Sequence, residues 1–556
     1  MRVPLRGASA GLLVALVAAI TIDCGSSSDK PPDRILVGDG GGFPDAAGEG
    51  DGAGDDGEGS GDATTDVTPR PNGGPPATIT PGAADRILLV GTVVTPDTSF
   101  DGQVLVEQDK ITCVQEGSAC AAAAGASGAT VIDTHGVIAP GLIDAHNHIL
   151  FDIFDDDDWT PARLYTNHTQ WTAEARYAAM LDVKQCLAND SQGKPSWCVD
   201  GTTTLGSKYG NAAGSLRCEI DKWGELKGLV AGTTSIVGLA GTTAACFSSL
   251  ARSIDAPQNG FGTDTVRSSA TFPPSTTTSD SVCAAFTSGS AKAFLVHCGE
   301  GLPSDATALG EFDRLTTAPS TDGCLDAPQT TLTHATAFGP TQFQAMAQAK
   351  MKITWSPRSN VSLYGATTDV PAALAAGVVV SLGPDWSMGG SQNMLDEMRF
   401  ADAIDDKQWG NKLDAKAIVT MATKNGAFAV GYSDRIGSLE VGYAADIVVV
   451  GGDRSAPYDA IVAARPSDVR LTMVGGKVLY GDAQLAAAGP ATPPCETLDV
   501  CGSPKFVCAA TADTTNKLGQ TFAQIKGALD QAMTDVDANS GSMYKFAPLT
   551  PLVKCN

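Results

Sequence analysis

Positive charge is scarce in this chain of 556 residues. Lysine and arginine number 37 against 62 aspartates and glutamates, which gives a formal net charge of −25. An acidic surface repels phosphate backbones, so the composition argues against nucleic acid as a partner. Once the leader and linker described next are set aside, roughly 470 residues remain, enough for one large barrel with a smaller satellite.

The apolar run at the N terminus falls short of a membrane span. It extends from Gly11 to Ile22 behind Arg2 and Arg6, so residues 1–24 are expected to be an export signal. Cys24 with the following Gly-Ser-Ser-Ser resembles a bacterial lipoprotein processing site, although Asp23 stands where a small residue is expected. We therefore expect export to the bacterial cell envelope (periplasm or surface), with a lipid anchor on Cys24 as the only membrane contact. Ordinary secretory cleavage and an uncleaved anchor are the alternatives.

Hydrophobic residues are also sparse in residues 25–84, which are rich in Gly, Asp, Ser, Thr and Pro. Between Asp29 and Arg70 there are eleven acidic residues against three basic ones. Such a segment buries too little apolar surface to order itself, so we expect a disordered acidic tether.

No cysteine pair has zinc-finger spacing with a histidine pair, which excludes a thiolate metal site of that type. Thirteen of the 14 cysteines follow Cys24, and exported chains commonly use cysteines in disulfides. The sequence-local pairings are Cys113 with Cys120, Cys186 with Cys198, and Cys246 with Cys283. Cys298 is expected to be the free thiol. The remaining expectation is a Cys-rich C-terminal extension over residues 486–556, with one amphipathic helix near Lys517 to Met533, stapled to itself or to the main domain through Cys495, Cys501, Cys508 and Cys555.

Histidine is rare, with six in the chain, and four of them end apolar runs. His146 and His148 lie two apart after an extended run, so their imidazoles point to one face. His297 and His334 each end another run, and Asp385 follows a fourth. The C-terminal strand ends of a parallel α/β barrel carry its active site. Imidazoles with a carboxylate there would suit zinc or ferrous iron.

These motifs resemble the amidohydrolase superfamily. APGLIDAHNH at 139–148 is similar to its first-strand motif, and His297 with Glu300, His334 and LGPD at 382–385 follow in the order of that superfamily. WSPRSN at 355–360 and the segment 436–450 are similar as well, and the resemblance covers roughly Arg86 to Asp482. The His-x-x-Glu pairing is most similar to the cytosine deaminase and triazine hydrolase branch. The resemblance implies a (β/α)8 TIM-type barrel over 135–435 and a small composite β-sandwich built from 85–134 and 436–485.

The resemblance also implies roles for the site residues. His146, His148, His297 and Asp385 would bind one divalent metal ion, Zn²⁺ or Fe²⁺, and Asp385 would take a proton from the activated water. Glu300 would pass a proton to a leaving nitrogen, and His334 would hydrogen-bond the water or the oxyanion. Binuclear members use a lysine on strand four. The only lysine between Lys227 and His297 is Lys292, which lies at the wrong end of its strand, so one metal is favoured.

The implied activity is hydrolysis of a non-peptide C–N bond in a small cyclic amidine, amide or amine by a deaminase-type mechanism. Cleavage of a linear amide, such as a modified dipeptide, is an alternative, and a catalytically dead tethered binding or scaffold protein is a third. Substrate contacts are expected from Arg358 and Asn360, and from His168 unless that side chain is simply exposed. Asp155 to Asp158, in the insertion from Asp152 to Gly210, either line the mouth of the site or form a solvated loop. His135 is expected to be structural, and the oligomeric state is open.

Overall fold

The computed structural model describes residues 74–190, 193–239, 244–270, 274, 276–316 and 323–555. The expected export signal, the lipid anchor on Cys24 and the tether up to residue 73 lie outside these residues. The last part of the expected tether is in strands, because Thr78–Thr80 forms β1 and β2 begins at Ala83. Within the described ranges, no helix is both long enough and apolar enough to cross a membrane.

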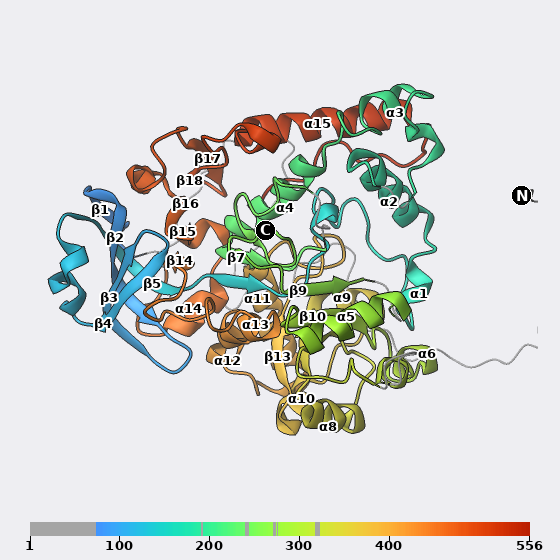
Figure 1. Ribbon diagram of the computed structural model, residues 1–556, viewed down its shortest axis with the longest axis horizontal. Coiled ribbons are helices and arrows are strands. Elements are labelled where there is room, and N and C mark those ends of the chain that lie inside the picture. Colours follow the sequence, from blue (N-terminus) through green and yellow to red (C-terminus); the bar gives the residue numbers. More distant parts are fainter. Residues whose placement is uncertain are drawn as a thin grey trace, which may run out of the picture. The chain divides into compact units, whose positions relative to one another are not determined.

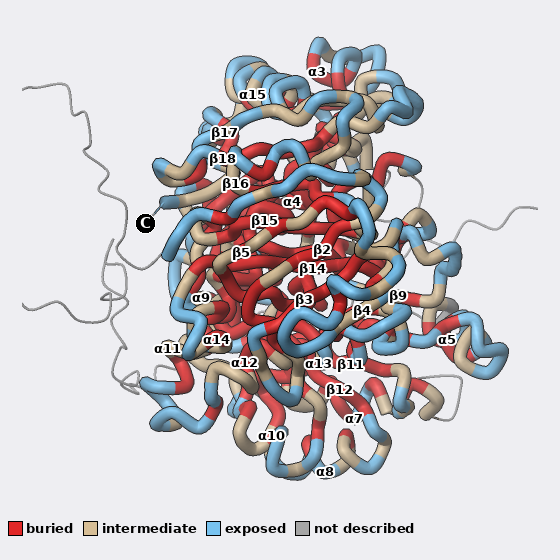
Figure 2. The backbone as a smooth tube through the Cα atoms, turned by 90° about the vertical axis from the view of Figure 1, so that its left-hand side faces the viewer, coloured by how far each residue is buried: buried red, intermediate tan, exposed pale blue. Residues whose placement is uncertain are grey.

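Strands from both ends of the described chain share one hydrogen-bonded sheet (Figure 1). Its order is β17-β18-β16-β15-β14-β5-β2-β3-β4, with β1 on β5; β2 and β5 are parallel and the other pairs antiparallel. The strands are β1 (Thr78–Thr80), β2 (Ala83–Val94), β3 (Ser99–Glu107), β4 (Lys110–Glu116), β5 (Ala129–Pro140), β14 (Ile447–Val450), β15 (Val469–Val474), β16 (Lys477–Asp482), β17 (Glu496–Val500) and β18 (Ser503–Val507). Figure 2 shows that buried backbone is concentrated around β5, β14 and β15. The sheet is composite, as expected, and also takes in β17 and β18 from the C-terminal extension.

The central part of the chain forms two parallel sheets, one of three strands and one of five. The first contains β6 (Leu142–Asp144), β7 (Thr233–Ile236) and β8 (Arg252–Ser253); the second contains β9 (Val266–Ser269), β10 (Ala293–Cys298), β11 (Thr330–His334), β12 (Lys352–Trp355) and β13 (Val379–Leu382). Backbone hydrogen bonds just beyond β6 and β13 link the two sheets, from Ala145 N to Leu382 O (3.1 Å) and from Asp385 N to His146 O (3.0 Å). The strands are short and mostly buried, as parallel strands covered on both faces are.

Helices alternate with most of these strands along the chain and pack against them, for example α4 on β7, α7 on β10 and α10 on β13. The helices of the described residues are α1 (His168–Trp171), α2 (Ala175–Leu187), α3 (Thr204–Lys208), α4 (Arg217–Leu229), α5 (Thr276–Ser288), α6 (Ala306–Leu309), α7 (Glu311–Thr316), α8 (Pro340–Ala349), α9 (Pro357–Tyr364), α10 (Val370–Ala376), α11 (Met394–Ile404), α12 (Ala415–Met421), α13 (Lys424–Ala429), α14 (Pro457–Ala463) and α15 (Phe522–Asn539). The alternation of strands and helices gives the chain an α/β fold with parallel sheets.

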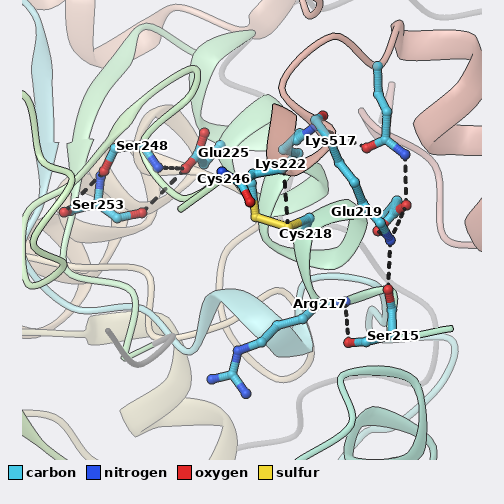
Figure 3. Close-up of a disulfide and its surroundings, with 12 residues drawn as sticks. Ser215, Arg217, Cys218, Glu219, Lys222, Glu225, Cys246, Ser248, Ser253 and Lys517 are labelled. Carbon is cyan, nitrogen blue, oxygen red and sulfur yellow. Dashed lines mark hydrogen bonds and ion pairs between the residues drawn. A yellow bond between two sulfur atoms is a disulfide. The ribbon is translucent and has the colours of Figure 1, made fainter. Parts of the chain in front are cut away.

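The C-terminal extension packs on α4. Lys517 Nζ lies 2.8 Å from Glu219 Oε1, Lys222 Nζ donates to Gln520 Oε1 (3.0 Å), and the rings of Trp223 and Phe522 stack with centroids 6.1 Å apart. Figure 3 shows the Lys517 and Glu219 pair beside the Cys218–Cys246 disulfide. A helix was expected in this extension from Lys517, and α15 instead begins at Phe522.

The later start of α15 has a local cause. Thr521 Oγ1 accepts from Gln524 N (3.2 Å), and Gln524 Oε1 accepts from Thr521 N (3.0 Å). This capping box satisfies the free amides at the start of the helix and fixes its first turn there.

Six disulfides join cysteines of the described residues. The expected pairs Cys113–Cys120 and Cys186–Cys198 are present, Cys298 is free and buried, and the tail is stapled to itself through Cys495–Cys508 and Cys501–Cys555. The expected Cys246–Cys283 pair is wrong. α4 brings Cys218 to Cys246 with a Cα–Cα distance of 5.8 Å, and Cys283 pairs with Cys324. Cys218 lies 28 residues before Cys246 and is nearer in sequence than Cys283, and α4 places it within bonding distance.

Candidate metal centre

The four histidines and the aspartate singled out in the sequence lie at the C-terminal ends of parallel strands. His146 and His148 follow β6, His297 lies on β10, His334 ends β11, and Asp385 follows β13. Cys298 and His334 are register partners, and Asn147 and Asp385 form a parallel bridge. Adjacent strand ends thus bring residues up to 239 positions apart into contact.

Their side chains converge on one point. His146 Nε2 lies 3.0 Å and His148 Nε2 3.4 Å from Asp385 Oδ1, and His148 Nε2 lies 3.2 Å from His297 Nε2. Ligand atoms of His146, His297, His334 and Asp385 all lie within 4.8 Å of one another, and all four residues are buried. Within the described part of the chain, this is the one cluster of His, Cys, Asp or Glu with such spacing.

Burial keeps these imidazoles neutral. It lowers the pKa of His146 and of His297 to about 3, and it also lowers the pKa of His148 and of His334. The neutral imidazoles of His146 and His297 can direct nitrogen lone pairs toward the carboxylate of Asp385, and a cation between them would balance these donors. The cluster therefore fits a divalent metal of the zinc or ferrous type.

The backbone around the cluster is held in place from behind. Asp144 Oδ1 accepts from His146 N (3.0 Å) and Oδ2 accepts from Asn147 Nδ2 (2.8 Å), so Asn147 faces away from the site as its alternation predicts. His334 and Asp385 have φ angles of 73° and 74°, a left-handed conformation that costs of order 1–3 kcal/mol for such residues. Asp385 N donates to His146 O (3.0 Å), His148 N donates to Asp385 O (2.6 Å), and Thr368 Oγ1 donates to His334 O (2.5 Å). These hydrogen bonds stabilise that conformation.

Glu300 lies next to the cluster, three residues beyond His297. Its Oε2 is 3.8 Å from His334 Nε2, and its Oε1 accepts a hydrogen bond from the Tyr364 hydroxyl (2.6 Å). Burial raises the pKa of Glu300 to about 7. A carboxyl group with that pKa can give up or take a proton near neutral pH.

Asn360, expected to contact substrate, lies against His334. Its Nδ2 donates to His334 Nδ1 (3.0 Å), which places the imidazole proton on Nε2 in this amide orientation. Nε2 then presents a donor toward Glu300 and the cluster. Among the described residues, the buried Oδ1 of Asn360 has no hydrogen-bond partner.

The two charged residues expected at the substrate are engaged with the protein itself. Arg358 pairs with Asp396 (3.0 Å) and with Asp156 (3.4 Å). His168 is largely buried rather than simply exposed, and its Nε2 lies 2.7 Å from Glu311 Oε1. Of the three expected substrate contacts, the structure brings Asn360 into contact with the cluster and places the other two on carboxylates of the chain.

The four consecutive aspartates form neither a solvated loop nor a charged mouth. Asp155 is buried, accepts from Thr550 Oγ1 and pairs with Lys554 (3.0 Å) in the C-terminal extension. Asp156 accepts from Gly389 N (2.6 Å), and Asp158 Oδ2 accepts from Asp155 N (3.0 Å). Asp157 alone is largely exposed. Their carboxylates hold the insertion to the loop after β13 and to the tail.

Aromatic residues near the cluster were missed in the sequence. Trp386 follows Asp385, and its ring centroid lies 5.3 Å from His148, 5.3 Å from Trp171 and 6.0 Å from Phe151. Trp171 comes from the insertion, and Phe151 directly precedes it. Nothing in their spacing marks the face that they present, so only the folded chain reveals their position.

Glu397 lies on α11, the helix that follows the loop containing Asp385, and its burial predicts a pH-dependent stability. It is fully buried, Ser391 Oγ donates to it, and burial raises its pKa from 4.5 to about 8. The folded state binds this proton more tightly than the unfolded state, so the free energy of unfolding falls as the pH rises from 4.5 to about 8. We expect Glu397→Gln to gain about 4 kcal/mol relative to the wild type between pH 5 and pH 8.5, measured by urea unfolding. Parallel pH profiles of the two proteins would contradict this, and the exposed Glu440→Gln serves as the control.

A family model described as "Amidohydrolase family" matches residues 231–479. A 5-methylthioadenosine/S-adenosylhomocysteine deaminase from Desulfitobacterium hafniense is 36% identical over 152 residues, which are 26% of this chain and 35% of that relative. A protein of the same name from Haloarcula marismortui is 27% identical over 430 residues, 72% of this chain and 93% of the relative. The alignment thus spans only about a third of the first relative and nearly all of the second.

Two solved structures share the fold. E. coli guanine deaminase has a TM-score of 0.50 at 16% identity, over 71% of this chain and 99% of that one. A mutant of atrazine chlorohydrolase from Arthrobacter aurescens TC1, complexed with zinc and atraton, has a TM-score of 0.50 at 18% identity, over 73% of this chain and 96% of that one.

Proposed function

The chain belongs to the amidohydrolase superfamily, and on that basis we propose that it is a metal-dependent hydrolase that cleaves a non-peptide C–N bond in a small molecule by a deaminase-type reaction. One observation carries the proposal. The carboxyl group of Glu300 is buried 3.8 Å from His334 Nε2, beside the cluster of His146, His297 and Asp385. A proton carrier therefore stands next to a group of residues that fits a metal ion.

Each residue has a defined role in the reaction. His146, His148, His297 and Asp385 would hold the metal, which when bound would lower the pKa of a water to about 7 and so supply a nucleophile at neutral pH. Asp385 accepts a proton as the water attacks. Glu300 in its protonated form gives its own proton to the leaving nitrogen, and the proton held by Asp385 returns to Glu300 or to solvent after the product leaves; a pKa of about 7 suits Glu300 to this role. His334 donates from Nε2 to the oxygen on which negative charge develops, because Asn360 occupies its Nδ1.

We assign one zinc or ferrous ion to the cluster. A second metal in this superfamily uses a bridging lysine on the fourth strand, and β9 reads Val-Arg-Ser-Ser. Lys292 lies at the opposite end of β10 and pairs with Asp434 (3.6 Å). Three imidazoles with a carboxylate accept either metal.

The finer architecture is part of the proposal. The eight strands of the two parallel sheets would close into a (β/α)8 barrel, supported by the hydrogen bonds between the ends of β6 and β13. The ten-stranded composite sheet would fold as the small β-sandwich of such hydrolases.

The substrate class is a small ring that carries an amine or an amide. The named relatives act on purine derivatives, and the test starts with those compounds. Zinc-loaded protein is incubated with 5-methylthioadenosine, S-adenosylhomocysteine, guanine, cytosine, an aminotriazine and an N-acyl dipeptide, and ammonia release is measured. We expect ammonia from at least one ring amine. A free amine and a carboxylate from the dipeptide would indicate linear amide hydrolysis instead, and silence at full metal occupancy would indicate a binding protein.

We also propose export with a lipid anchor on Cys24. The six disulfides among the described residues support an oxidising compartment. Labelled palmitate should be incorporated into the wild-type chain and not into Cys24→Ser. A wild-type chain without label, or equal label in both proteins, would refute the anchor.

A further inference from the structure

The backbone of Glu300 is bound by the insertion. His168 N donates to Glu300 O (3.2 Å), Leu302 N donates to Thr166 O (2.8 Å), and Asn167 and Gly301 form an antiparallel bridge. A Cβ at Gly301 would lie 2.5 Å from Thr166 O, so this close approach requires glycine. The insertion lies outside the segment that the family model matches, 231–479.

The side chain of Glu300 is held by the same insertion through one intermediate residue. Trp171 Nε1, in α1, donates to the Tyr364 hydroxyl (3.0 Å), and that hydroxyl lies 2.6 Å from Glu300 Oε1. All three residues are buried, with 7%, 2% and 4% of their surfaces exposed. Water therefore competes little for these hydrogen bonds.

The hydrogen bonds from Trp171 to Tyr364 and from Tyr364 to Glu300 have a fixed direction. The indole nitrogen can only donate, so the Tyr364 oxygen accepts from Trp171 and its single proton is donated to Glu300. Oε1 of Glu300 is then an acceptor. The carbonyl oxygen of a carboxylic acid is a better acceptor than its hydroxyl oxygen, so a proton on the carboxyl group is favoured on Oε2, the oxygen 3.8 Å from His334 Nε2.

We propose that Trp171 and Tyr364 are positioning residues that keep the proton of Glu300 on the oxygen facing the metal cluster. The proposal rests on the function proposed above, in which Glu300 transfers a proton. The pair would align the carboxyl group before substrate arrives, and misalignment of a catalytic group by about 1 Å can cost 100-fold in rate. Through Trp171 the insertion contributes to catalysis as well as to shape.

Two measurements on Tyr364→Phe test the proposal. Phenylalanine keeps the ring and removes the donor. On the ring amine that the wild type deaminates fastest, kcat should fall about 10- to 100-fold, with KM and metal content unchanged. In infrared difference spectra of the acid form, assigned by subtraction of Glu300→Gln, the C=O band of Glu300 should shift to higher wavenumber because its carbonyl oxygen loses a hydrogen bond.

Matched variants separate this role from simple packing. Trp171→Phe should shift the band and lower kcat in the same directions as Tyr364→Phe, but by smaller amounts. It replaces Tyr364→Phe as the test variant if Tyr364→Phe fails to fold. Tyr480→Phe removes an equally buried hydroxyl, bonded to Pro466 O (3.3 Å), and should change neither. An unshifted band or an unchanged kcat in both test variants would overturn the proposal. The infrared measurement needs no substrate, so it tests the positioning role independently of the proposed function. Failure of the proposed function would instead appear as a Glu300→Gln variant that keeps its activity.

Discussion

Replacing Glu300 by glutamine is expected to lower kcat by about 100- to 10,000-fold, the usual contribution of a general acid or base. Glutamine has nearly the same shape, and its amide oxygen can still accept from Tyr364. It has no proton to give to the leaving nitrogen. Metal content, measured by mass spectrometry, and the unfolding temperature should stay at the wild-type values. Steady-state kinetics on the deaminated ring amine give the result.

Glu225→Gln is the matched control for this variant. Burial raises the pKa of Glu225 to about 7 as it does for Glu300, but Glu225 lies on α4 and accepts from Ser248 N and from Leu250 N (2.9 Å). It should keep wild-type kcat. If Glu300→Gln turned over at a rate comparable to the wild type, the deaminase-type assignment would be wrong.

Replacing His297 by alanine is expected to remove the metal. His297 Nε2 lies 3.2 Å from His148 Nε2, and its Nδ1 lies 3.2 Å from Ser269 O, which orients the ring toward the cluster. Loss of a residue behind a ligand typically costs 10- to 100-fold in metal affinity, so loss of the ligand itself should cost more than about 100-fold. Competition titration with a zinc chelator measures the affinity.

A second readout follows from linkage. Bound metal stabilises only the folded state, so a chelator should lower the unfolding temperature of the wild type and leave that of His297→Ala unchanged. His135→Ala is the control, because His135 pairs with Asp133 (3.4 Å) on β5, away from the strand ends. Equal chelator effects on wild type and His297→Ala would show that the metal is held elsewhere.

The strand ends could be predicted because their signals are local. An apolar run followed by His146, His297 or His334 marks both a buried strand and the point where it ends, and parallel strands bring those ends together. The position of Glu300 could be predicted for the same reason, since it lies three residues after His297, next to the end of β10. The contacts of Arg358 could not be predicted. Its position after β12 suggested the mouth of the site, but Asp156 and Asp396 arrive from distant segments and neutralise it.

Contacts between distant segments account for the rest. Trp171 and Tyr364 lie 193 residues apart, and no spacing in either segment predicts their hydrogen bond. Asp155 accepts from Thr550 across 395 residues, so this member of an aspartate run that suggests a solvated loop is in fact a buried acceptor. The expected Cys246–Cys283 pair is wrong because α4 places Cys218 against Cys246, and nothing in the cysteine spacing distinguishes the two partners.

Metal content is the most direct test of the central claim that these strand ends hold one catalytic ion. The full chain is purified without chelator beside Asp385→Ala, and zinc and iron are measured per mole of protein. We expect one equivalent of zinc or iron in the wild type and none in Asp385→Ala. Two equivalents in the wild type, or none after reconstitution with either metal, would contradict it.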